Sequence, residues 1–163
     1  MKKYLKQVVV LSLLAITLIA SVAFAPKISS YKCMIQMTNY SGEGAYIVIS
    51  LINQKGNYEK TLYVQGDDEK WYHDIKEWWR FYGKKRISLD AITGATIGGG
   101  GRAINVIELE DAKIDAGYSL RFETAVEDKP YYVKDVEIPL TSENIKAKHE
   151  GKGFIRYVRI MPN

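Results

Sequence analysis

Apolar and polar residues alternate along most of the chain beyond its first 30 residues, which is the pattern of β-strands with one buried face. Residues 31–38 alternate in this way, and residues 45–52, "AYIVISLI", form a β-branched run typical of a central strand. The sequence "SGEG" at residues 41–44 lies between these two runs and predicts a hairpin loop that joins them. Turns are also predicted at residues 53–58 and 127–130. Further strands are predicted at residues 59–64, 103–109, 118–127, 131–139 and 153–161.

Six to eight short strands at this spacing favour two antiparallel sheets packed face to face. A chain of 163 residues can bury enough surface to fold without disulfides or metals. The single cysteine, Cys33, excludes an internal disulfide, and we expect it to be a core residue of its strand. The sequence therefore predicts a mainly β protein, an immunoglobulin-like two-sheet β-sandwich that forms one domain over residues 26–163.

One segment departs from the strand pattern. Residues 67–83, "DDEKWYHDIKEWWRFYG", carry large apolar side chains at helical spacing, namely Trp71, Ile75, Trp78, Trp79 and Tyr82. Two aspartates suit the start of a helix, and Gly83 followed by three basic residues suits its end. We predict a single amphipathic helix that lies across the sandwich. Its tryptophans are expected to pack against a sheet, and Trp78 or Trp79 could in addition line a flat aromatic ligand.

The N-terminus has the pattern of an export signal. Lys2, Lys3 and Lys6 precede an apolar stretch of 18 residues, 8–25, which is near the lower limit for spanning a bilayer. Residues 1–25 are therefore predicted to be either a cleaved signal peptide or a retained signal-anchor. In both cases the remainder of the chain is expected outside the cytoplasm, in the periplasm or at the cell surface.

The charge and the motifs exclude several functions. The chain has a formal charge of +4, but three of its 23 basic residues lie in the leader, which leaves 20 basic against 19 acidic residues. The remaining sequence shows no basic face, so nucleic-acid binding is not predicted. His73 and His149 lack the contexts of haem attachment or of zinc proteases, and the glycines after residue 97 form neither a P-loop nor a dinucleotide fingerprint. We expect no metal site and no catalytic residue.

The segment "DAITGAT", residues 90–96, comes between the predicted helix and four consecutive glycines, residues 98–101. It resembles the acceptor motif for covalent flavinylation: an Asp, two variable residues, Ser/Thr-Gly-Ala and a final Ser/Thr. Sites of this kind occur in the Na⁺-pumping NADH:quinone oxidoreductase and related complexes, where a flavin transferase links FMN to the last hydroxyl through a phosphoester. The resemblance implies FMN on Thr96. Recognition by the transferase would fall to Asp90, Thr93, Gly94 and Ala95.

A wider likeness covers about residues 31–137. The leader, the strands, the Trp-bearing helix, the acceptor motif and the glycine loop are similar to a family of predicted periplasmic proteins catalogued as a domain of unknown function. In that family Arg and often Pro follow the motif, whereas here Ile97 and four glycines precede Arg102. The likeness implies an electron-transfer role with a flavin transferase and a membrane electron-transfer protein, of the PepSY-like type, as partners.

The residue types suit such a role. A threonine hydroxyl is a poor nucleophile alone, so the acceptor must enter another enzyme's active site on an exposed, deformable loop. Gly94 and the four glycines would allow close approach. Trp78 and Trp79, with Tyr82, are candidates for stacking on the flavin ring, and Arg102 or the basic residues 84–86 for neutralising its phosphate.

Two other functions stay open at this point. The chain could be a non-redox immunoglobulin-like binding or scaffold module of the cell envelope, in which the motif is an ordinary turn. It could also be a flavin reductase that acts on a soluble acceptor. We expect a redox carrier modified by a transferase rather than a stand-alone enzyme.

Overall fold

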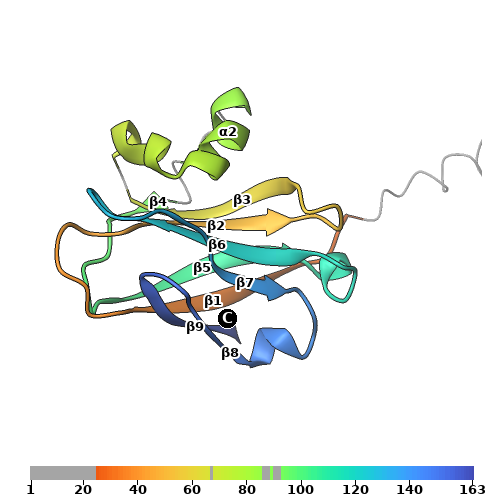
Figure 1. Ribbon diagram of the computed structural model, residues 1–163. Coiled ribbons are helices and arrows are strands. Elements are labelled where there is room, and N and C mark those ends of the chain that lie inside the picture. The colour runs from red at the N-terminus through yellow and green to blue at the C-terminus, as the bar shows by residue number, and fades with distance from the viewer. Residues whose placement is uncertain (1–24, 67, 86–88, 90–92) are drawn as a thin grey trace, which may run out of the picture.

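The structure is a computed structural model, which describes residues 25–66, 68–85, 89 and 93–163. Figure 1 shows two stacked β-sheets with a helical segment over the outer face of one of them. The four-stranded sheet has the order β5-β1-β9-β8 and the five-stranded sheet the order β4-β3-β2-β6-β7. The strands are β1 (Ile28–Met37), β2 (Tyr46–Ile52), β3 (Tyr58–Gln65), β4 (Thr93–Gly94), β5 (Arg102–Glu110), β6 (Ser119–Ala125), β7 (Tyr132–Pro139), β8 (Lys148–Glu150) and β9 (Ile155–Pro162).

The two-sheet, mainly β architecture predicted from the sequence is confirmed, while the closer immunoglobulin-like assignment stays a prediction. Hairpins join β2 to β3 and β6 to β7 at the turns predicted for residues 53–58 and 127–130. The hairpin predicted at residues 41–44 is wrong: β1 pairs with β5 and β9, and β2 pairs with β3 and β6. Residues 41–44 instead carry the chain from one sheet to the other.

The main core lies between the sheets and is built by the alternation that the sequence shows. In β1 the odd-numbered side chains from Cys33 to Met37 are fully buried, whereas the even-numbered ones face outward. The buried, odd-numbered side chains meet apolar side chains of the opposite sheet, such as Ile47, Leu120 and Phe122. Burial raises the pKa of the Cys33 thiol to about 12, which suits an unreactive core residue.

The helical segment is divided, so the prediction of one continuous helix over residues 67–83 is wrong. A 3₁₀ helix, η1 (Glu69–Asp74), precedes α2 (Lys76–Lys85), and the chain turns at Ile75 with ψ of 71°. The turn allows both Tyr72 and Ile75 to enter the core beneath the segment. Asp68 caps η1 by accepting a hydrogen bond from the Lys70 amide at 3.2 Å.

A second core lies between the helical segment and the five-stranded sheet. It combines Trp78, Tyr72 and Ile75 from the helices with Val48 and Val64 from the sheet. The outer face of the four-stranded sheet has no such cover among the described residues (Figure 1). Within the described part of the chain, no helix has the length and apolar character needed to cross a membrane.

Candidate functional site

The described part of the acceptor segment runs along the open edge of the five-stranded sheet. Thr93 and Gly94 form β4, which pairs in parallel with the end of β3 at Val64 and Gln65. Three residues later Ile97 makes an antiparallel bridge with Ala45, just before β2. The segment therefore changes from one strand partner to another across Ala95 and Thr96. Asp90 lies outside the described residues.

Hydrogen bonds fix both ends of this bend. The Gly66 amide donates to the Gly94 carbonyl, and the Gln65 side-chain amide donates to the Ala95 carbonyl. On the other side, the Ala45 amide donates to the Ile97 carbonyl at 2.7 Å. The segment is thus held at two points rather than loose along its length, and the freedom expected of an acceptor is confined to the bend.

The Thr96 side chain is half-buried and Ala95 is exposed, so the bend is open to solvent. A Cβ atom added to Gly44 would lie 2.4 Å from Oγ1 of Thr96 and 2.7 Å from its Cβ. Among the described residues, Thr96 Oγ1 makes no hydrogen bond. Thr96 is therefore not sealed in the core, its hydroxyl is not hydrogen-bonded to a described neighbour, and the absence of a side chain on Gly44 leaves room for this oxygen.

The glycine loop at residues 98–101 follows the bend and folds tightly onto the end of β1. A Cβ on Gly99 would lie 1.9 Å from the Tyr40 carbonyl oxygen, and Gly100 has a φ of +74°. The Gly100 amide donates to the Thr38 carbonyl at 2.8 Å, and the Met37 amide donates to the Gly101 carbonyl at 2.9 Å. Gly99 thus allows a close backbone approach that has no room for a side chain, and Gly100 takes a left-handed conformation that favours glycine.

The two tryptophans named from the sequence differ in burial. Trp78 is 0% exposed, stacks on Tyr82 at 4.8 Å and donates from Nε1 to Thr61 Oγ1 at 2.8 Å. Its ring is therefore enclosed by the helix–sheet core, as the packing interpretation expects. Trp79 is half-buried and keeps part of its ring at the surface, so a ligand-stacking role stays a prediction for it.

The cations named from the sequence lie on two different elements. Arg102, at the start of β5, is exposed, and its Nε donates to Gln36 Oε1 at 2.9 Å. Gln36 in turn donates from Nε2 to the Gly100 carbonyl at 2.9 Å, which ties Arg102 to the glycine loop. Lys84 is exposed on α2, while Arg86 lies outside the described residues. Arg102 is thus the described candidate that belongs to the same hydrogen-bonded group as the loop after Thr96.

Gln65 and Tyr63 beneath the bend are polar residues that the sequence did not single out. Gln65 is 7% exposed, and its Oε1 is buried without a hydrogen-bond partner among the described residues. The Tyr63 hydroxyl oxygen would lie 2.6 Å from a Cβ on Gly94, and burial raises the pKa of this tyrosine. A buried acceptor without a partner and a phenol beside the bend are groups that suit the hydroxyls of a ligand, so these residues fit the ribityl part of FMN.

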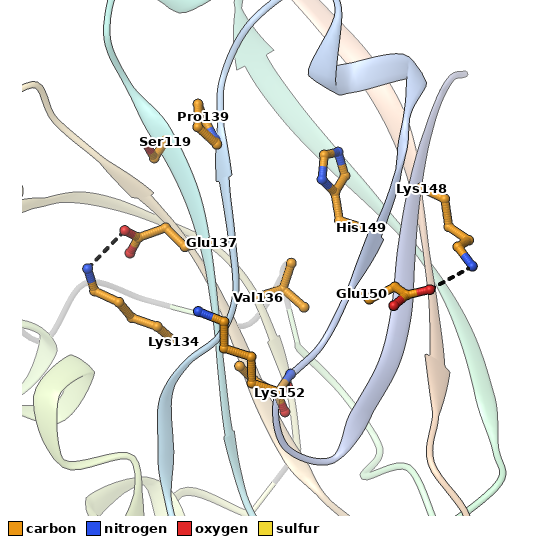
Figure 2. A pocket seen from close by; sticks show the side chains of 10 residues that line it. Ser119, Lys134, Val136, Glu137, Pro139, Lys148, His149, Glu150 and Lys152 are labelled. Atoms are coloured by element: carbon orange, nitrogen blue, oxygen red, sulfur yellow. Dashed lines mark hydrogen bonds and ion pairs between the residues drawn. The ribbon is translucent and has the colours of Figure 1, made fainter.

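A separate cavity of about 480 Å³ lies between the edge strands β7 and β8 (Figure 2). Its charged groups are largely paired, Lys134 with Glu137 at 2.9 Å and Lys148 with Glu150 at 3.1 Å. His149 Nε2 lies 2.7 Å from the Asn144 carbonyl oxygen. Because β7 and β4 are opposite edges of the five-stranded sheet, this cavity is remote from Thr96.

The comparisons with known proteins give one match. The family model described as "Predicted periplasmic protein (DUF2271)" matches residues 29–157, which include the acceptor segment and all strands except the first residue of β1 and the last five residues of β9. No curated protein sequence and no solved structure matches the chain.

Proposed function

The chain belongs to the family of predicted periplasmic proteins (DUF2271), and on this premise we propose that it is an extracytoplasmic electron-transfer protein that carries FMN, linked by a phosphoester to Thr96. The observation that carries the proposal is the bend at Ala95 and Thr96. It presents a partly exposed hydroxyl, which has no hydrogen bond to the described residues, between two fixed ends of an acceptor-type sequence.

The bend suits modification by another enzyme. A side-chain oxygen that already accepts or donates strong hydrogen bonds would have to break them before reacting, and Thr96 Oγ1 has none to break among the described residues. Gly44 leaves the space beside this oxygen without a side chain. Ala95 adds only a methyl group next to it.

The attachment step uses FAD as the donor of FMN and a Mg²⁺-dependent flavin transferase as the catalyst. Thr96 Oγ1 forms a new P–O bond to the FMN phosphate, and the P–O bond between that phosphate and AMP breaks. The hydroxyl proton passes to a base of the transferase, because no described carboxylate or imidazole of this chain forms a hydrogen bond with the hydroxyl. AMP is the leaving group, and the step involves no change of oxidation state.

The chain's own residues would hold the attached group in place. Gln65 Oε1 can accept a hydrogen bond from a ribityl hydroxyl or a ring N–H, which would satisfy its unpaired buried oxygen. Arg102 can neutralise the phosphate charge. The isoalloxazine ring supplies the redox chemistry, since it takes up one or two electrons, and the covalent link keeps it at a fixed effective concentration outside the cytoplasm. A membrane electron-transfer protein would be its redox partner.

The decisive experiment co-expresses the full chain with a flavin transferase and examines denatured protein by in-gel flavin fluorescence and intact mass. Wild type and Thr96→Ser should be fluorescent and heavier by FMN less one water, because both retain a hydroxyl at residue 96. Thr96→Val, which replaces the hydroxyl by a methyl of similar size, should be dark.

Thr93→Ser is the matched control, because it alters the other threonine of the segment while keeping the hydroxyl that the acceptor motif allows there and leaving the attachment atom untouched. Its band should persist. A dark wild-type band with the mass of the bare polypeptide would overturn the proposal and favour the binding or scaffold module. Turnover of a soluble acceptor by the flavinylated protein would favour a reductase over a carrier.

A further inference from the structure

The outer face of the four-stranded sheet carries an exposed apolar patch. Its members are Ile104 at 58% exposure, Val106 at 48% and Met161 at 37%. The register places Val106, Lys32 and Met161 side by side on β5, β1 and β9, and Ile104, Met34 and Arg159 side by side in the next row. Directly opposed residues of antiparallel strands point to the same face. We call these six residues the β1 face.

The β1 face is cationic as well as apolar. Lys32 and Arg159 alternate with the apolar side chains, and neither makes an ion pair with a described residue. Lys148 extends the second row on β8, and Arg102 lies one row further along β5. Acidic residues on the same side of the sheet lie beyond these two rows, at Glu108, Glu110 and Glu150. The central two rows thus combine apolar side chains with positive charge and contain no carboxylate.

The path of the chain indicates what this face meets. Its first strand, β1, begins at Ile28, which is itself 54% exposed, and the apolar stretch of residues 8–25 precedes it in the sequence. Only Pro26 and Lys27 separate the two, a distance of about 10 Å at full extension. In the form that keeps its N-terminal segment in a bilayer, the start of β1 therefore cannot leave the membrane surface.

We propose that the β1 face docks on the surface of an anionic lipid bilayer. The apolar side chains enter the interfacial region while Lys32 and Arg159 attract acidic headgroups, the same combination that holds amphipathic helices at an interface. The opposite outer face cannot do this, because η1 and α2 cover it. Docking brings the Gln36–Arg102 row, which contacts the glycine loop after Thr96, down to the membrane. The proposal does not depend on the flavin.

The test uses the full chain reconstituted into vesicles of phosphatidylcholine, alone or mixed equally with phosphatidylglycerol. A polarity-sensitive thiol probe is attached at Val106→Cys, or at Lys76→Cys on the exposed start of α2 as the control position. Native Cys33 is 0% exposed and should not be labelled. The Val106 probe should shift to the blue in the mixed vesicles only, and the Lys76 probe should not shift in either.

Charge reversal separates docking from a general response to lipid. Lys32→Glu with Arg159→Glu should lower the docked-to-undocked ratio by at least about 30-fold, since each cation near such a surface contributes about fivefold. The matched variant, Lys60→Glu with Lys76→Glu, makes the same change of charge elsewhere and should leave the Val106 probe shift unchanged. A Val106 probe that reads the same in both kinds of vesicle would overturn the proposal. So would equal effects of the two double variants.

Discussion

Gly44 and Thr96 lie so close that a Cβ atom on the glycine would be 2.4 Å from the threonine hydroxyl oxygen. The two residues come from different parts of the chain, one from the connection between the sheets and the other from the acceptor segment. The bridge between Ala45 and Ile97 holds them in this position. The absence of a side chain at residue 44 is therefore part of the site.

Gly44→Ala should lower flavin incorporation at Thr96, because the added methyl group must displace the hydroxyl or the backbone around it. Flavin stoichiometry, from absorbance of the purified co-expressed protein, measures the effect. Gly98→Ala is the matched control, since a Cβ there meets nothing within 4 Å and the residue is exposed. Equal flavin incorporation in both variants would show that Gly44 is not part of the site.

Glu123 should make folding stability depend on pH. Its buried carboxylate accepts hydrogen bonds from the Tyr58 and Tyr131 hydroxyls and lies near Arg121, yet burial dominates and raises its pKa from 4.5 to about 7. Because the folded state favours the neutral form, this stabilising contribution is complete below pH 4.5 and is lost as the pH rises to about 7.

Glu123→Gln isolates that contribution, because glutamine keeps the shape without the charge. Urea unfolding of both proteins at several pH values should show the wild type losing up to about 3 kcal/mol relative to the variant between pH 4.5 and 7. A constant difference across this range would mean that Glu123 does not titrate there.

Among the described carboxylates, Asp135 should be the one whose substitution lowers the free energy of unfolding most. It is fully buried, and its oxygens accept hydrogen bonds from Thr124 Oγ1 at 2.6 Å and from the four consecutive amides of residues 152–155. Asp135→Asn places an N–H₂ group against these donors and should cost about 2–4 kcal/mol of unfolding free energy. Asp115→Asn, at an exposed residue that bonds Ser142, should cost less than about 1 kcal/mol by the same urea titration.

Substitutions of Trp78 and Trp79 should differ in how much they lower the free energy of unfolding. Trp78→Phe removes buried volume and the bond to Thr61, and should cost about 2–3 kcal/mol. Trp79→Phe acts at a half-buried side chain and should cost less than about 1 kcal/mol. Urea midpoints followed by far-ultraviolet circular dichroism avoid the change in tryptophan emission. Equal losses would contradict the assignment of Trp78 to the core.

Most strands could be predicted because alternation is a local property of the sequence. The predicted run at residues 103–109 differs from β5, Arg102–Glu110, by one residue at each end. Strand pairing is not local, so residues 41–44 looked like a hairpin although they connect two sheets. The two-residue strand β4 owes its conformation to the partner strand β3 and leaves no pattern of its own.

The buried polar residues were harder to predict from the sequence. Glu123 lies within β6 and its extension, where residues 120–126 are all buried, and a carboxylate inside such a run is the signal that was available. Gln65 carried no such signal, because its importance comes from the carbonyl of Ala95, 30 positions away in the sequence. Asp135 likewise depends on amides that follow it by 17 to 20 positions.

The position of β1 in its sheet has a consequence for biogenesis. This first strand is flanked by β5 on one side and by the final strand, β9, on the other. The sheet therefore cannot close until β9 has left the ribosome, and contacts between distant segments form slowly. A nascent chain in which this sheet is still open can pass through a narrow translocation channel, which a closed sheet could not enter.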